Sequence, residues 1–298
     1  MGRVSFVFSG QGDQYPGMGK DLYDRYPEAE KVFRLCDAIR PGTSKQCFSG
    51  TAEELKETVN TQPCLFAMEM AAAQVLLEQG VRPDAVAGFS LGEVTAATVA
   101  GCFDLETGFR LVCKRGELLQ AEAEKHDTAM AAVVKLSAEE VSSLCEKYEG
   151  LYPVNFNCPG QTTVSGLSAQ MAAFSAEVKA AGGRALSLKV KGAFHSPFMA
   201  EAAKAFASEL EKAERRENAI PLYSNVTAEP YTGDPAAFLA KQIESPVQWE
   251  KLVRNQIASG IDTFIEIGPG RTLTNMIRKI DTNVSAVSVF DYLEEHVC

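Results

Sequence analysis

Runs of apolar residues alternate with helical patterns along most of the chain and predict a mixed α/β fold. A β-branched and aromatic run at 4–8 predicts a first strand, which ends in a glycine-rich turn. A later helix is expected to carry Pro63 in its first turn, where a missing N–H is tolerated. A short apolar run at 85–89 predicts a strand that leads into Ser90, and the small residues at 91–100 predict the helix that follows.

The segment between 128 and 190 has a different succession of predicted elements, in the order β-α-β-β-α-β. Its predicted strands are 130–136, 153–157, 161–165 and 185–190, and its predicted helices are 138–148 and 169–181. This order is the split βαβ plan of a ferredoxin-like unit. We therefore expect residues 127–193 to form a small insert in a larger domain made of 1–126 and 194–298, whose strands alternate with helices in a mainly parallel sheet.

Composition and charge narrow the possible functions. A formal net charge of −10 argues against nucleic-acid binding, which needs a basic footprint. No apolar run is long enough for a signal peptide or a membrane span, so we expect a cytoplasmic protein without membrane association. The eight cysteines form no Cys-x-x-Cys pair and have no histidine at ligand spacing. They predict neither disulfides nor a metal site, and are typical of small buried residues in a reducing compartment.

The run Gly88-Phe89-Ser90-Leu91-Gly92 matches Gly-x-Ser-x-Gly and lies between a predicted strand and a predicted helix. A sharp turn in that setting exposes the serine hydroxyl above the sheet and predicts an α/β-hydrolase-like large domain. The flanking glycines avoid collisions in the turn, and the Leu91 N–H at the helix start can face a developing oxyanion. The alternative is a glycine-rich connection whose serine only caps the helix. We expect Ser90 to be a nucleophile.

A serine nucleophile needs a base to take its proton, and the chain has three histidines. His126 lies in a polar stretch, and His296 lies close to the C-terminus, where we expect fraying. His195 follows a glycine loop at which the predicted insert ends and a helix begins. His195 is therefore the candidate base, and the alternative is a loop histidine with local hydrogen bonds.

One arginine of the predicted helix 105–120 lies on the wrong face for a charged residue. Arg110 and Lys114 share a polar face, whereas Arg115 falls among apolar residues. An unpaired buried charge is too costly to tolerate, so Arg115 needs an anion. That anion is either a protein carboxylate in an internal salt bridge or a substrate carboxylate held by the planar guanidinium fork.

Ordered sequence blocks closely resemble the malonyl-CoA:acyl carrier protein transacylase family over nearly the whole chain. They include Phe-Ser-Gly-Gln-Gly at 8–12 with Gly-Met-Gly at 17–19, Gly-Phe-Ser-Leu-Gly-Glu at 88–93, Arg-Gly at 115–116, Asn-Phe-Asn-Cys-Pro-Gly-Gln at 155–161, Gly-Ala-Phe-His-Ser-Pro at 192–197, and further blocks at 221–227, 246–249 and 266–270. Several blocks in the family's order are far more specific than any one of them alone.

The resemblance implies transfer of a malonyl group from malonyl-CoA to the phosphopantetheine thiol of acyl carrier protein, by a ping-pong mechanism through a malonyl-serine. Ser90 would attack, and His195 would act as base and then as acid. Backbone N–H groups of Gln11 and Leu91 would form the oxyanion hole, and Arg115 would bind the malonyl carboxylate. The resemblance implies no bound cofactor and no metal, since the coenzyme A thioester is a substrate. It also implies an active site in the cleft between the two domains.

Further positions follow from the same resemblance. Phe194 would crowd an α-methyl group and so favour malonyl groups. A backbone carbonyl near Gln248 would orient the catalytic histidine in place of an aspartate. Phe89 replaces the family's usual histidine before the nucleophile, which leaves His195 as the only base. Leu119 stands where a methionine is frequent in the pocket wall.

The carrier proteins of such enzymes are typically acidic, and so is this chain, so docking would need a local basic patch. The candidates on the insert are Lys179, Arg184, Lys189 and Lys191. The alternative is that these are solvated charges at a strand edge, where they guard against aggregation. Stand-alone relatives are commonly monomers, and we expect a monomer here.

Two rival functions remain open from the sequence. A serine hydrolase or thioesterase would share Ser90 and His195 but would have no use for Arg115. A catalytically silent docking subunit would need none of the three. The sequence also leaves open whether the carrier belongs to fatty-acid or to polyketide synthesis, because the same site serves both.

Overall fold

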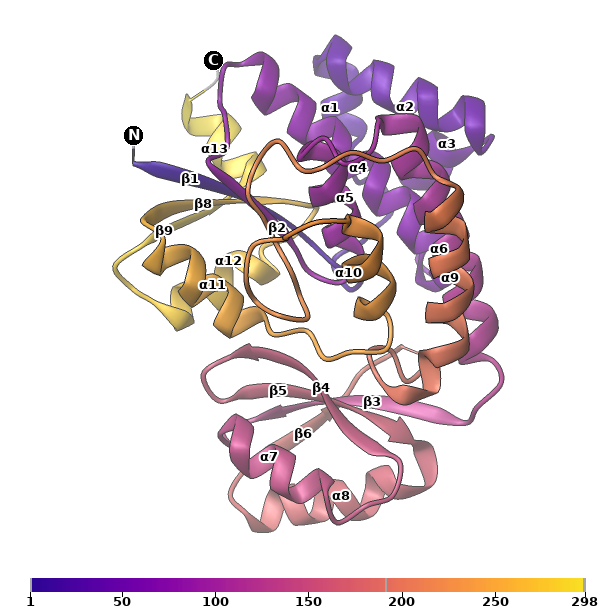
Figure 1. Ribbon diagram of the computed structural model, residues 1–298, viewed down its shortest axis with the longest axis vertical. Helices are drawn as coiled ribbons and strands as arrows, with labels where there is room; N and C mark the ends of the chain where they lie inside the picture. Colours follow the sequence, from indigo (N-terminus) through magenta and orange to yellow (C-terminus); the bar gives the residue numbers. More distant parts are fainter. Residues whose placement is uncertain (1, 191, 297–298) are drawn as a thin grey trace.

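The protein contains a larger unit around a parallel sheet and a smaller unit around an antiparallel sheet, as Figure 1 shows for the computed structural model. The structure describes residues 2–190 and 192–296. The larger sheet has the strand order β7-β2-β1-β8-β9, and its paired neighbours are all parallel. Its strands are β1 (Arg3–Phe8), β2 (Ala85–Gly88), β7 (Leu222–Tyr223), β8 (Ile261–Ile267) and β9 (Ser285–Ser288). The expected mainly parallel sheet is confirmed.

Both faces of the parallel sheet are buried, as the apolar sequence of β1 requires. Phe6 and Phe8 pack into the core on one side of the sheet, and Val7 between them packs into the core on the other side. The first face is covered by α4 (Thr58–Glu78), α5 (Leu91–Val99) and α13 (Val289–His296), and the second by α11 (Trp249–Ala258) and α12 (Thr272–Ile280).

An outer layer of helices lies against α4 (Figure 1). It consists of α1 (Lys20–Arg25), α2 (Pro27–Ile39), α3 (Thr43–Ser49) and α6 (Leu105–Ala123), and continues through α9 (Ala200–Lys212) to α10 (Pro235–Gln242). No helix within the described residues is both long and apolar enough to span a membrane.

The start of α4 differs from the expectation. The helix begins at Thr58, so Pro63 lies inside it and not in its first turn. An internal proline removes a hydrogen bond and costs roughly 3 kcal/mol or more. The helix is buried on nearly all sides, and burial of its apolar side chains offsets this cost. The expected start after Thr61, which would have put Pro63 in the first turn, is therefore wrong, because the helix already begins at Thr58.

The smaller unit has the expected β-α-β-β-α-β order. Its elements are β3 (Thr128–Val134), α7 (Ala138–Cys145), β4 (Leu151–Cys158), β5 (Gln161–Leu167), α8 (Ser168–Ala180) and β6 (Arg184–Ser187). The strand order β4-β5-β3-β6 is antiparallel throughout. Val133, Phe174 and Val178 belong to a core of its own between the sheet and its two helices. The ferredoxin-like arrangement is therefore confirmed.

Strand β4 attaches the smaller sheet to the larger unit. The Phe156 N–H donates to the Val247 carbonyl at 2.9 Å, and the Val247 N–H donates to the Val154 carbonyl at 2.8 Å. Helices α7 and α8 lie on the far side of the smaller sheet in Figure 1. The other face of that sheet is thereby turned toward the larger unit, where β1 and β2 end.

Candidate active site

Ser90 lies in the turn between β2 and α5 and has a strained backbone, with φ 55° and ψ −106°. The turn is too crowded for side chains at its flanking positions. A Cβ on Gly88 would lie 1.8 Å from the Gly92 backbone, and a Cβ on Gly92 would lie 2.3 Å from the Phe8 carbonyl oxygen. Both glycines are thus required by close approach, as the sequence motif predicts.

The buried side chain of Asn225 braces this turn from the segment after β7. Its Oδ1 accepts the Ser90 N–H at 2.8 Å, and its Nδ2 donates to the Gly88 carbonyl at 2.6 Å. One amide therefore closes the two ends of the strained turn. Asn225 was not singled out from the sequence, where its only signal was membership of the block 221–227.

The structure brings His195 to Ser90, and its Nε2 lies 2.7 Å from the Ser90 Oγ. Its Nδ1 lies 2.9 Å from the backbone carbonyl of Gln242 and must carry the proton, because a carbonyl can only accept. Nε2 is then free to accept the serine proton. The His195 backbone is also strained, with φ 61°.

The carbonyl that orients the histidine belongs to Gln242 and not to a residue near Gln248, which corrects the expectation. Gln242 is the last residue of α10, where carbonyls have no partner within the helix. Gln248 instead precedes α11 and donates its N–H to the Asn225 carbonyl at 2.8 Å. It lines neither of the two cavities described below.

Burial and, after it, the positive charge of Arg115 lower the pKa of His195 to about 4, against a smaller opposing effect of backbone carbonyls. A histidine with this pKa is neutral at neutral pH. Its Nε2 can therefore take a proton from Ser90 without first losing one to solvent.

The Arg115 side chain is fully buried beside the nucleophile. Its Nη2 donates to the Ser90 Oγ at 3.2 Å and to the Gln242 Oε1 at 2.8 Å, whereas its Nε and Nη1 have no partner. Among the described residues it forms no salt bridge, so the structure does not contain the internal salt bridge to a protein carboxylate that was the alternative. Burial lowers its pKa to about 10, which the charge of Glu93 opposes, so Arg115 remains a cation at neutral pH.

A small cavity of about 100 Å³ opens beside the nucleophile and the base. Ser90 and His195 line it together with Phe194, Leu119 and Met130. The predicted wall residues Phe194 and Leu119 are thus brought to the nucleophile, and the apolar wall leaves little space beyond a short acyl group.

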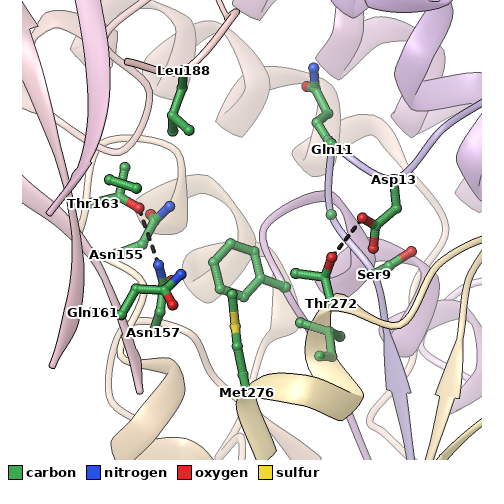
Figure 2. Close-up of a pocket in the computed structure, with 15 residues that line it drawn as sticks. Ser9, Gln11, Asp13, Asn155, Asn157, Gln161, Thr163, Leu188, Thr272 and Met276 are labelled. Atoms are coloured by element: carbon green, nitrogen blue, oxygen red, sulfur yellow. Dashed lines mark hydrogen bonds between the residues drawn. The ribbon is translucent and has the colours of Figure 1, made fainter. Parts of the chain in front are cut away.

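A larger cavity of about 280 Å³ adjoins the first (Figure 2), and both are lined by Gln11, Phe89, Asn155 and Leu188. Polar side chains from the smaller sheet face polar side chains of the larger unit across it. In Figure 2, Asn157 donates to Thr163 at 3.2 Å. The Oδ1 atoms of Asn155 and Asn157 are buried without a partner, and can accept hydrogen bonds from a ligand.

Comparison with known proteins assigns the family. The acyl transferase domain family matches residues 5–292. The chain belongs to this acyltransferase family. It is 36% identical over 299 residues to the malonyl CoA-acyl carrier protein transacylase of Bacillus subtilis (strain 168), covering 98% of this chain and 94% of that protein.

Solved structures agree with this assignment. The acyltransferase superposes with a TM-score of 0.94 on malonyl CoA-acyl carrier protein transacylase from Clostridium perfringens, at 32% identity over 98% of this chain and 96% of that one. It superposes equally, at 0.94 and 32% identity over 99% and 100% of the two chains, on a malonyl-transacylase in complex with its type II PKS acyl-carrier protein.

Other residues that the sequence singled out lie in or beside the turns around the nucleophile of the acyltransferase. Gln11 lies in the turn after β1, and Leu91 is the first residue of α5, so its N–H has no intrahelical acceptor. The ring of Phe89 packs against Trp249 at 5.5 Å between ring centroids. Gln62 was not singled out from the sequence, and its Nε2 donates to the Gln11 Oε1 at 3.1 Å. The available signal was a polar side chain in a helix whose buried residues are mostly apolar.

The other two histidines of the acyltransferase lie outside both cavities. His126 is exposed, and its ring packs at a tilt against Phe198 at 5.2 Å between ring centroids. His296 ends α13, where its Nδ1 lies 3.0 Å from the Tyr292 carbonyl and its ring stacks on Tyr292, so the expected fraying is not what the structure has.

The depressed pKa of His195 gives a direct prediction. In a ¹³C-labelled sample, the ring signal of His195 is expected to show the neutral form at pH 7 and to titrate near 4, because burial and Arg115 both disfavour the cation. At about pH 5 roughly nine-tenths of the ring should still be neutral. NMR spectra of the His195→Ala variant assign the signal, and a midpoint at the ordinary 6.5 would contradict the buried geometry.

Proposed function

We propose that this acyltransferase carries a malonyl group from malonyl-CoA to the phosphopantetheine thiol of an acyl carrier protein. The observation that carries the proposal is a buried cation without a protein anion, since Arg115 lies 3.2 Å from the Ser90 Oγ and keeps two nitrogens unpartnered. A short acyl group that ends in a carboxylate supplies the missing anion. The names of the relatives, which are malonyl transacylases, support the same substrate.

The first half-reaction loads the enzyme. Arg115 binds the malonyl carboxylate, and His195 Nε2 takes the proton of Ser90 as its Oγ attacks the thioester carbonyl. The N–H groups of Gln11 and Leu91 donate to the oxyanion of the tetrahedral intermediate, and one such donor is worth about 10²–10³ in rate. The carbon–sulfur bond breaks, the coenzyme A sulfur takes the proton from His195, and malonyl-Ser90 remains.

The second half-reaction unloads the enzyme by the same groups in reverse. The pantetheine thiol of the carrier gives its proton to His195 and attacks the malonyl ester. The Ser90 oxygen leaves and takes the proton back, and the malonyl group is now a thioester of the carrier. The small cavity limits the acyl group that Ser90 can hold, and Phe194 in its wall disfavours an α-methyl group by roughly 1–3 kcal/mol.

The larger cavity is suited to the pantetheine arm, which coenzyme A and the carrier have in common. This arm contains two amide groups, and their N–H groups are partners for the unpaired Oδ1 atoms of Asn155 and Asn157. The cavity adjoins the small one at Gln11, so an arm lying in it would deliver its sulfur to Ser90.

The carrier itself would dock on basic residues of the smaller unit. Lys179, Arg184 and Lys189 are exposed, whereas Lys191 lies outside the described residues. Exposed charges on a docking surface speed and orient the encounter with an acidic partner more than they tighten it. Ser90, His195 and Arg115 come from one chain, which supports a monomer as the working unit.

Loading and transfer can be observed directly. With malonyl-CoA alone, the intact mass is expected to increase by one malonyl group, and the Ser90→Ala variant should show no increase. On addition of carrier protein the malonyl group should move to the carrier. Release of coenzyme A at the same rate with and without carrier would instead favour the hydrolase, and absence of any adduct would favour the silent docking subunit.

Substitution of Arg115 should change the preference of the enzyme for malonyl over acetyl groups. In Arg115→Ala, kcat/KM for malonyl loading is expected to fall about 10- to 150-fold, because hydrogen bonds to a charged group contribute roughly 1.5–3 kcal/mol. Acetyl loading should fall far less. Arg110→Ala is the matched control, since Arg110 lies on the exposed face of the same helix and pairs with Glu106. Equal losses of kcat/KM for malonyl and acetyl loading would show that Arg115 does not bind the malonyl carboxylate.

The Michaelis constants for malonyl-CoA and for the carrier distinguish the cavity that would hold the pantetheine arm from the surface on which the carrier would dock. Asn157→Leu is expected to raise KM about 2- to 13-fold for both malonyl-CoA and the carrier, because a hydrogen bond of about 0.5–1.5 kcal/mol to the shared arm is lost. Lys189→Glu should raise KM for the carrier only. An unchanged carrier KM in Lys189→Glu would remove that residue from the docking surface, and an effect of Asn157→Leu on one substrate alone would exclude a shared arm site.

A further inference from the structure

Glu93 is a fully buried carboxylate that none of the steps above uses. It lies in the first turn of α5, three residues after Ser90. Its Oε1 accepts the Asn225 N–H at 2.9 Å and the Tyr231 hydroxyl at 2.7 Å, and its Oε2 accepts the Gln242 Nε2 at 2.7 Å. All three partners are donors, so the site is built for an ionised carboxylate that can only accept.

The carboxylate determines which way the Gln242 side chain points. The Gln242 Nε2 donates both to Glu93 and, at 2.6 Å, to the Ser90 carbonyl. Its Oε1 is therefore left to face Arg115, whose Nη2 donates to it at 2.8 Å. The opposite orientation would set an amide oxygen against two other acceptors and an NH₂ group against a cation, and both contacts repel.

Gln242 contacts all three principal groups of the site. Besides its bonds to Ser90 and Arg115, its backbone carbonyl accepts from the Nδ1 of His195 at 2.9 Å. Asn225, the second residue bonded to Glu93, holds both ends of the Ser90 turn. Glu93 thus bonds to the two residues that hold the nucleophile, the base and the cation in place.

We propose that Glu93 is a positioning residue for acyl transfer, which acts through Gln242 and Asn225 to fix the alignment of Ser90, His195 and Arg115. Its negative charge also faces the Arg115 cation across the Gln242 amide, at a distance beyond a direct salt bridge. In other serine enzymes an aspartate bonds directly to the catalytic histidine and orients it. Glu93 has the same orienting effect here, but it acts through Gln242, which bonds to His195. The proposal rests on the proposed function for its substrates.

The energetics of the site support this assignment. Burial raises the pKa of Glu93 to about 7, while the bonds from Tyr231, Asn225 and Gln242 and the charge of Arg115 hold it down. The ionised form therefore depends on the donors around it. Loss of the charge should in turn release the orientation of the Gln242 amide, since a neutral side chain at position 93 no longer requires an NH₂ group to face it.

A second buried glutamate provides a matched control. Glu69 in α4 is fully buried, and its carboxylate accepts from the hydroxyls of Ser9 at 2.9 Å and Thr95 at 2.6 Å. It makes no hydrogen bond to Ser90, His195, Arg115 or Gln242 among the described contacts. Glu69→Gln therefore makes the same substitution at another buried glutamate of the fold without touching the alignment.

The test compares Glu93→Gln with Glu69→Gln and the unsubstituted enzyme. Thermal unfolding verifies that each variant is folded. We expect Glu93→Gln to lower kcat for malonyl transfer at least about 10-fold, the loss that follows when about 1.4 kcal/mol of transition-state alignment is removed. It should also lower the ratio of malonyl to acetyl loading, because Arg115 loses its fixed partner. Glu69→Gln should leave kcat and this ratio unchanged.

A second readout separates this inference from the proposed function. The rate at which a fluorophosphonate labels Ser90 depends on the alignment of serine and histidine and on no malonyl group. If the unsubstituted enzyme is labelled but transfers no malonyl, the proposed function fails, and slow labelling of Glu93→Gln still supports the role of Glu93. Full labelling, kcat and malonyl preference in folded Glu93→Gln would overturn that role, as would equal losses in Glu69→Gln.

If Glu93→Gln does not fold, Gln242→Met tests the same link from its other end. This variant removes the amide but keeps the backbone carbonyl that holds His195. It is expected to lower the ratio of malonyl to acetyl loading, and an unchanged ratio would overturn the proposal.

Discussion

A guanidinium cation buried against a serine hydroxyl is the constraint on which the rest of this site depends. Arg115 is removed from water, makes no salt bridge among the described residues, and is held only by the Ser90 Oγ and the Gln242 side chain. Its charge lowers the pKa of His195 beyond the effect of burial, which keeps the base neutral. It also lies opposite the one buried carboxylate of the network, Glu93, whose ionised form it favours. A buried cation is stable only when paired, and a substrate carboxylate completes the pairing.

The fold delivers these groups from distant parts of the chain. The nucleophile comes from the turn after β2, the cation from α6, the base from the segment after β6, and the orienting carbonyl from the end of α10. The smaller sheet, attached through β4, forms the opposite wall of the cavity next to the site. The strained backbones of Ser90 and His195 persist because the packing of both units over-determines them.

The sequence predicted the groups that carry a local signature and missed those defined only by tertiary contacts. Ser90 was evident from glycines that its turn requires, and Arg115 from its place on an apolar helix face. The orienting carbonyl was assigned near Gln248 but belongs to Gln242, because any residue can offer a carbonyl and only the end of α10 decides which one is free. Glu93 was part of a recognised motif, yet its role depends on three donors from elsewhere in the chain.

The central claim is that the activated hydroxyl and the buried cation in contact with it bind the two ends of the same acyl group. A crystal structure of the enzyme trapped after reaction with malonyl-CoA tests this most directly. The account predicts an ester on the Ser90 Oγ whose free carboxylate accepts hydrogen bonds from the unpartnered nitrogens of Arg115. A malonyl carboxylate that points away from Arg115, toward solvent or into the neighbouring cavity, would contradict it.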